Sequence, residues 1–156
     1  MINLAPFLTK KSLEALNINL AHPISNLLTS EGKGVVSDVD EQIILCFPFS
    51  QIVKLHSLKI TLKQNLGGSG PKTVKTYVNR SSTLAFDNNS GDIETVIFTE
   101  NDLLPESMPK NLRFVKYQNV VHLTLFVVDN QAGSEITEIS EITFYGSTSE
   151  NTKPVA

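Results

Sequence analysis

The feature that most constrains the fold of this chain is a series of short apolar runs separated by turn-forming residues. In several runs apolar and polar residues alternate, which is the pattern of a β-strand with one buried face. The breaks are rich in glycine and asparagine, as at residues 88–91 and 130–133. No helical period fills the gaps between these runs. The pattern therefore predicts an all-β fold, an antiparallel β-sandwich or barrel.

At least seven strands are expected. In the run 120–129, Val121, Leu123 and Leu125 fall on one face. Pro48 lacks a backbone N–H, so it is expected to confine the run 42–47 to an edge or an end of a sheet. A short helix is expected over residues 9–16, with Thr9 as its N-cap. The expected strands are 42–47, 54–63, 73–79, 93–99, 112–118, 120–129 and 136–145.

The length and composition indicate one domain with a core of its own. A chain of 156 residues buries about 70% of the surface that it exposes when unfolded. We expect residues 1–148 to form this domain, with a short N-terminal helix or arm. The polar residues 149–156 are expected to form a flexible tail.

The charge and targeting signals narrow the class of protein. The net charge is −3, which argues against a nucleic-acid binder, and only Lys72, Lys75 and Arg80 approach a basic patch. No apolar run reaches the roughly 18 residues of a membrane span. The N-terminal residues lack the pattern of a signal peptide, and the single cysteine, Cys46, excludes an internal disulfide. We therefore expect a cytoplasmic and nuclear protein that meets neither nucleic acid nor membrane.

Residues 37–49, SDVDEQIILCFPF, place Asp38, Asp40 and Glu41 before an apolar run. Three interpretations are open: a turn that leads into a buried strand, a polar contact surface, or a metal site. A calcium-binding EF-hand loop is excluded, because its sixth and twelfth positions would be Ile43 and Phe49. The side chains of Asp and Ser accept hydrogen bonds from nearby backbone N–H groups, which favours the turn.

Other motifs give no catalytic or metal-binding constellation. Residues 66–73 lack the glycines of a phosphate loop, and Pro71 occupies the last position of a would-be nucleophile elbow. His56 and His122 are expected to be half-buried structural residues, and no histidine is spaced like a metal ligand. Cys46 lies in an apolar run, where burial raises the thiol pKa and lowers its reactivity. The sequence thus predicts no enzyme, cofactor or metal.

Several segments together resemble the PITH domain, a module that occurs at the C-terminus of certain thioredoxin-like proteins and also free-standing. They follow the order of that family and cover nearly the whole chain. The matching segments are NLAPF (3–7), ALN (15–17), SDVDEQ (37–42), VKLHS (53–57), GPKTVK (70–75) with VN (78–79), LAFD (84–87), TENDL (99–103), LRFVKYQNV (112–120) and ITFYG (142–146).

This resemblance implies a jelly-roll-like β-sandwich, similar to galactose-binding-like modules. It also implies a non-catalytic role, the docking of a thioredoxin-like protein to the regulatory particle of the 26S proteasome, with a thioredoxin domain in cis or in trans. No Cys-x-x-Cys motif is present, so the chain is either a free-standing member or a fragment. Relatives can carry cysteine where this chain has Leu13, Ala15 and Val39.

Two binding functions follow from these observations. The first is protein docking through a surface patch, and the second is a lectin-like ligand-binding jelly roll, although the chain has no tryptophan to stack on a sugar. For docking, the candidate contact residues lie in the acidic cluster, in the connection 67–75 and just after it. These candidates are Asp38, Asp40, Glu41, Lys72, Lys75, Tyr77, Asn79 and Arg80.

Overall fold

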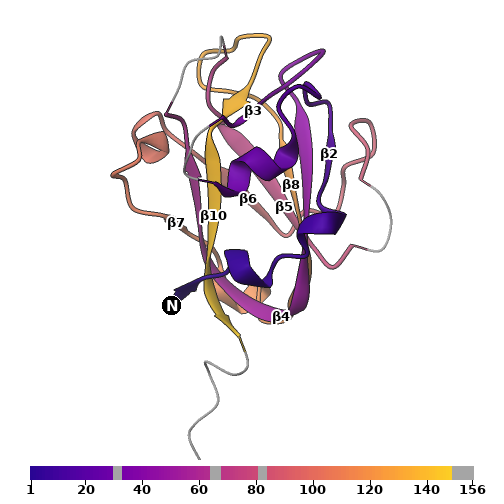
Figure 1. The fold of residues 1–156 in the computed structure, drawn as a ribbon, viewed down its shortest axis with the longest axis vertical. Helices are drawn as coiled ribbons and strands as arrows, with labels where there is room; N and C mark the ends of the chain where they lie inside the picture. Colours follow the sequence, from indigo (N-terminus) through magenta and orange to yellow (C-terminus); the bar gives the residue numbers. More distant parts are fainter. Residues whose placement is uncertain (30–32, 64–67, 81–83, 149–156) are drawn as a thin grey trace, which may run out of the picture.

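The computed structural model of the chain describes residues 1–29, 33–63, 68–80 and 84–148, which form an antiparallel β structure (Figure 1). The strands are β1 (Ile2–Asn3), β2 (Glu14–Leu16), β3 (Val35–Val36), β4 (Ile43–Thr61), β5 (Thr73–Val78), β6 (Glu94–Ile97), β7 (Lys110–Asn111), β8 (Val120–Val127), β9 (Glu138–Ile139) and β10 (Glu141–Thr148). Short 3-10 helices connect them: η1 (Ala5–Phe7), η2 (Lys10–Ser12), η3 (Ile24–Leu28), η4 (Asn101–Leu103) and η5 (Phe114–Lys116). In the described part of the chain, no helix is long and apolar enough to cross a membrane. The predicted all-β antiparallel class is confirmed.

Strand β4 organises the fold because both halves of one curled sheet share it. The sheet has the order β1-β10-β4-β8-β5-β6, and β2 and β7 also pair with β4, while β3 and β9 form a separate small sheet. The first part of β4 pairs with β8 from Ile43 to Pro48, and the second part pairs with β10 from Val53 to Thr61. In Figure 1, β4 runs down one side, turns at the bottom and rises beside β10. One strand therefore carries the chain from one face of the sandwich to the other.

The expectation that Pro48 confines its strand to an edge or an end is wrong. Strand β4 continues through Pro48, which lies opposite His122 of β8. The register between the two strands shifts between Pro48 and Val53, so the missing N–H falls at an irregularity of the ladder. The Pro48 carbonyl still accepts a hydrogen bond from the N–H of Thr9, at 2.8 Å. The bulge thus allows a proline inside an inner strand, and the predicted strands 42–47 and 54–63 merge into one.

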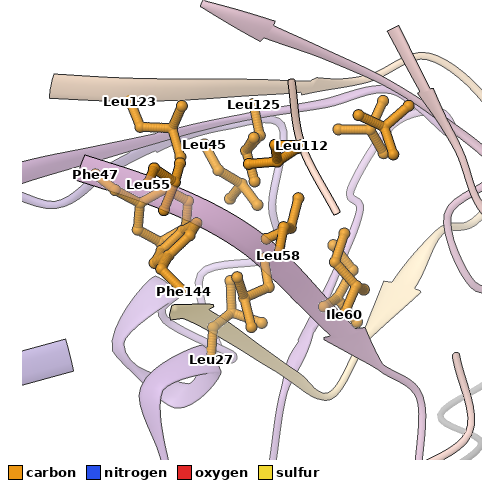
Figure 2. Packing of buried hydrophobic residues seen from close by; sticks show 14 of the residues in the cluster. Leu27, Leu45, Phe47, Leu55, Leu58, Ile60, Leu112, Leu123, Leu125 and Phe144 are labelled. Atoms are coloured by element: carbon orange, nitrogen blue, oxygen red, sulfur yellow. The ribbon is translucent and has the colours of Figure 1, made fainter. Parts of the chain in front are cut away.

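The core lies between the two halves of the sheet. Leu45, Phe47, Leu55 and Leu58 of β4 are fully buried and lie close to Phe144 of β10 (Figure 2). The rings of Phe47 and Phe144 meet edge to face, with their centroids 4.9 Å apart. Burying side chains of this size stabilises a fold by about 1.5–3 kcal/mol each. The inward face changes phase between Leu55 and Leu58, because the register between β4 and β10 shifts there.

The outer face of β4 and its neighbours is covered as well. Ile44, Tyr77, Leu84 and Phe126 form a second buried cluster. Phe86 packs its ring edge on Phe126, at a centroid distance of 5.9 Å. Both faces of the first half of β4 are therefore buried, which explains why the run 43–47 is continuously apolar.

Lys59 shows how the second half of β4 is covered on its polar face. Its side chain is only 7% exposed, although it alternates with Leu58 and Ile60. Its Nζ donates hydrogen bonds to the carbonyl oxygens of Asp102 (2.8 Å) and Leu104 (2.6 Å). Burial lowers the pKa of Lys59, and the negative charge of Asp102 opposes this shift. The lysine therefore anchors the η4 turn on the sheet.

Two further expectations are corrected. The predicted helix over residues 9–16 is wrong, because only Lys10–Ser12 forms a 3-10 turn and Glu14–Leu16 forms β2, paired with β4. The predicted strand 112–118 is also wrong, since its middle forms η5, which leads to the buried Tyr117. In both places packing against β4 decides the local structure. The expected strands 73–79, 93–99 and 120–129 are confirmed as β5, β6 and β8, and 136–145 divides into β9 and β10.

Gly146→Ala is expected to destabilise the domain, because a Cβ at this position would lie 1.9 Å from the Lys54 carbonyl oxygen. Such overpacking costs about 1–3 kcal/mol, measured as the free energy of unfolding in urea. Ser147→Ala, one residue further along β10, is the matched control and is expected to change stability by less than about 0.5 kcal/mol. Equal stability of the two variants would contradict the close approach of β10 to β4.

Candidate functional site

The acidic cluster forms a turn between β3 and β4. The Asp40 Oδ1 accepts hydrogen bonds from the backbone N–H of Gln42 (3.0 Å) and from the side-chain amide of Asn17 (2.9 Å). Asp38 and Asp40 are exposed, and Glu41 is half-buried. The interpretation of this stretch as a turn that enters a buried strand is confirmed. Its use as a contact surface stays a prediction.

Asn17 holds this turn in place. Its backbone φ is +65°, a conformation that asparagine tolerates better than most residues. Its carbonyl oxygen accepts the N–H of Asp38 (3.1 Å), and its Oδ1 accepts the N–H of Val39 (2.9 Å). Its Nδ2 donates to the carbonyl of Gln42 (2.7 Å) as well as to Asp40. One asparagine thus pairs with backbone groups of Asp38, Val39, Asp40 and Gln42.

A second set of polar residues joins the acidic turn to the loop that follows β8, and this loop in turn contacts the start of β5. Thr137 donates its hydroxyl to the Glu41 carbonyl (2.6 Å), and its N–H donates to the Ser37 hydroxyl (2.9 Å). The side-chain amide of Asn130 donates to the Thr137 hydroxyl (3.1 Å). The N–H of Lys72 donates to the carbonyl of Asp129, next to Asn130 (3.0 Å). The turn and the start of β5 therefore belong to one end of the sandwich, here called the loop end.

The predicted contact residues divide into two groups. The loop end brings together the three acids and Lys72. The other four lie along β5 and just beyond it: Lys75, Tyr77, Asn79 and Arg80. The structure thus places the first group at the loop end, on the β3–β4 turn and just before β5, and the second group along β5 and just beyond it.

The second group is partly structural. Tyr77 is 1% exposed, and its hydroxyl donates to the Asn89 carbonyl. The Arg80 guanidinium lies over the Tyr77 ring, 5.6 Å from its centroid, and donates to the carbonyl of Ser90 (2.8 Å). Lys75 reaches the side-chain oxygen of Asn89 (3.4 Å). These contacts attach residues 84–90 to the sheet. Of the three residues, Lys75 and Arg80 carry the charges that a partner could contact, whereas the buried Tyr77 packs beneath Arg80.

Among the described residues, Cys46 forms no hydrogen bond with a histidine. Cys46 is half-buried and accepts the Thr124 hydroxyl at 3.8 Å, and its burial raises the pKa of the thiol. His56 and His122 are half-buried, as expected. Among the described residues no three His, Cys, Asp or Glu side chains gather in a way that could hold a metal ion. Residue 67 of the connection 67–75 lies outside the described residues, and Ser69 forms a parallel bridge to Thr137.

Sequence reasoning missed the residues that hold the loop end together. Asn17, Asn130 and Thr137 are polar residues in loops, and their partners lie up to 100 residues away along the chain. The one local signal was the asparagine at position 17, at the end of a short apolar segment. Asparagine is enriched at positive φ, so this residue could have indicated a turn. The partners of the other two depend on tertiary contacts that no spacing reveals.

The PITH domain profile matches residues 1–156, which is the entire chain. The chain belongs to the PITH domain family. It is 35% identical over 140 residues to "Thioredoxin-like protein 1" of Schizosaccharomyces pombe, an alignment that covers 86% of this chain and 47% of the relative. It is 30% identical over 111 residues to "PITH domain-containing protein 1" of Dictyostelium discoideum, covering 69% of this chain and 51% of the relative. The PITH chain therefore spans about half the length of these curated relatives.

Solved structures confirm the galactose-binding-like jelly roll. The CBM32-1 and CBM32-2 domains of ZmpB from Clostridium perfringens align with a TM-score of 0.67 and 11% identity, covering 96% of this chain and 38% of that one. CBM32-3 from a family 31 glycoside hydrolase of the same organism aligns with a TM-score of 0.62 and 16% identity, covering 92% and 97%. At this identity the likeness shows the fold alone.

Replacing Asn17 separates its two contributions. Asn17→Ala loses the side-chain hydrogen bonds and places an alanine at positive φ. The free energy of unfolding is therefore expected to fall by about 2–3 kcal/mol. Asn17→Gly loses the same hydrogen bonds but accepts the conformation, and a smaller loss of about 1–2 kcal/mol is expected. Urea unfolding measures both values. Identical values for the two variants would show that the backbone conformation contributes nothing.

Tyr77 is expected to make stability fall at high pH. Burial, followed by the charge of Asp92, raises the pKa of Tyr77 to about 12, whereas a phenol in the unfolded chain has a pKa of about 10. The folded state therefore keeps a proton that the unfolded state releases, and stability is lost as the pH rises from about 10 towards 12. Thermal unfolding is measured from about pH 9 to about pH 11. Over this range the difference in melting temperature between the wild type and Tyr77→Phe should become smaller. A constant difference would contradict the shift.

Proposed function

We propose that this chain is a non-catalytic docking module that binds the regulatory particle of the 26S proteasome and brings a thioredoxin-like domain to it, in cis or in trans. The observation that carries the proposal is the PITH match over the whole chain, together with the 35% identity to a protein named for its thioredoxin-like character. The proposed location is the cytoplasm and nucleus.

The geometry of the described residues supports a binding role rather than catalysis. A nucleophile needs a base within hydrogen-bond reach and a group that orients the base. Cys46 instead contacts a threonine hydroxyl, and burial disfavours its thiolate. The polar network around Asn17, Asn130 and Thr137 joins backbone groups of loops, which fixes a surface shape. A rigid surface suits recognition, because little ordering is lost on binding.

The loop end is the first surface to test for docking. It holds Asp38, Asp40 and Glu41 on a turn with little freedom, next to the start of β5 with Lys72. Rim charges of this kind steer association and set its salt dependence. We infer that these four residues contact the partner, with Lys75 and Arg80 as a second and separate pair of contacts.

The lectin-like alternative has less support. Sugar sites commonly present an aromatic ring on which the sugar stacks. A cavity of about 430 Å³ is lined by residues such as Leu62, Ser69, Gly70, Leu103 and Gln131, and no aromatic side chain is among its described lining residues. The likeness to carbohydrate-binding modules therefore concerns the fold, and we do not propose sugar binding.

The docking proposal is tested with the purified chain and purified regulatory particle. The immobilised wild-type chain should retain the particle, and the variant Asp38→Asn/Asp40→Asn/Glu41→Gln should retain it about tenfold less well at low salt. These replacements keep the Asp40 acceptor oxygen that the turn needs. Thr95→Ala on β6 serves as the control. No retention by a wild-type chain shown to be folded would contradict the proposal, whereas retention unaffected by the triple variant would only move the contact surface elsewhere.

A further inference from the structure

Apolar side chains are exposed at the end of the molecule opposite the loop end, where β4 bends. Ile52, Phe114, Val115 and Val121 are 51%, 41%, 81% and 44% exposed, respectively. These four residues are here called the bend face. Single exposed apolar residues are common on proteins, but a contiguous group marks an interaction surface.

Two of the four are neighbours across the sheet. Val53 of β4 lies opposite Val120 of β8, and both are fully buried. Ile52 directly precedes Val53 and Val121 directly follows Val120, and both side chains are exposed, so they flank the same buried pair. They form the aliphatic half of the bend face.

The other two lie along the same stretch of β4. The ring of Phe114 packs against His56, with centroids 5.7 Å apart, and Val115 follows it in η5. The N–H of Leu55 donates to the carbonyl of Tyr117 (2.9 Å), which fixes this segment beside the strand. Residues 112–117 therefore lie beside the part of β4 that follows Ile52, and the chain then leads into β8 and Val121.

Asn79 makes the bend face rigid. Its φ is +54°, and its Oδ1 accepts the N–H groups of Val121 (2.8 Å) and His122 (3.0 Å). Its Nδ2 donates to the carbonyl of Asn119 (2.6 Å). The start of β8 is thereby held in one conformation. A partner that covers this face has little backbone to order, which favours binding.

The charge around the bend face is opposite to that of the chain as a whole, which is −3. Four cations stand in the sequence beside residues that form or support the bend face, namely Lys54, Arg80, Arg113 and Lys116. Two carboxylates lie close to these cations: Glu94 is 4.0 Å from Arg113 and also accepts the hydroxyl of Tyr117 (2.8 Å), and Asp92 accepts the hydroxyl of Thr95 (3.0 Å). Cations exceed carboxylates here, and an acidic partner would complement them.

We propose that the bend face docks an acidic segment of a partner protein that carries apolar side chains. Its apolar groups would cover the four exposed residues, and its carboxylates would meet the flanking cations. A protein segment is favoured over a lipid surface, because Phe114 and Val121 are only 41% and 44% exposed and present little apolar area for insertion among lipid chains. The proposal rests on the role of the chain as an interaction module, and it does not depend on the proteasome as the partner.

A random peptide library displayed on phage tests this inference. Selection on the wild-type chain should enrich peptides that combine Asp or Glu with Leu, Ile or Phe. The double variant Ile52→Ser/Val115→Ser should bind the selected peptides at least tenfold more weakly, and Lys54→Glu should weaken them several-fold at low salt. Ile97→Ser, which removes a 48% exposed side chain from β6, is the matched control and should bind like the wild type. Thermal unfolding confirms that each variant is folded.

The outcomes distinguish the alternatives. Neutral or basic selected peptides, or equal binding by the double variant, would overturn the inference. So would binding of the wild type to phosphatidylserine vesicles, or its self-association, if the double variant abolished it, because lipid or a second copy would then be the occupant. If the double variant binds no selected peptide yet still retains the regulatory particle, the bend face has another partner and the proteasome proposal stands. If it retains neither, the two functions share this face.

Discussion

The rest of the structure depends on the pairing of strand β4 with strands of both halves of the sheet. Its first half is held between β8 and β2, and its second half between β10 and β7. The side chains that point inward from both halves, such as Leu45 and Leu58, enter the same core. The two faces of the sandwich are therefore joined by one covalent strand as well as by packing. Neither face buries its apolar side chains without the other.

The two ends of the sandwich are stabilised by polar contacts rather than by apolar packing. Asn17 and Thr137 fix the loop end, and Asn79 fixes the start of β8 at the opposite end. The asparagines adopt positive φ and use their amides as a substitute for backbone partners. These contacts hold acids exposed at one end and apolar groups with cations at the other. A domain with two such ends is suited to bring two macromolecules together.

The sequence predicted the fold class well, because alternation in runs such as 73–79 and 120–129 is a local signal. It failed where tertiary contacts override local preference. Pro48 lies in an inner strand because a bulge removes the need for its N–H, and residues 112–118 form η5 because Tyr117 is drawn into the core. The acidic turn was predictable from Asp and Ser preferences. The division of the contact residues between two places was not, since it depends on where the loops after distant strands meet.

Hydrogen exchange along β4 tests the central claim most directly. If one strand unites the two halves, the amides in its first part, from Ile43 to Phe47, and in its second part, from Val53 to Ile60, are expected to open with the same free energy. That value should equal the free energy of global unfolding from urea denaturation. Measurably weaker protection of one part, with the other still at the global value, would show that the halves open separately and would contradict the account.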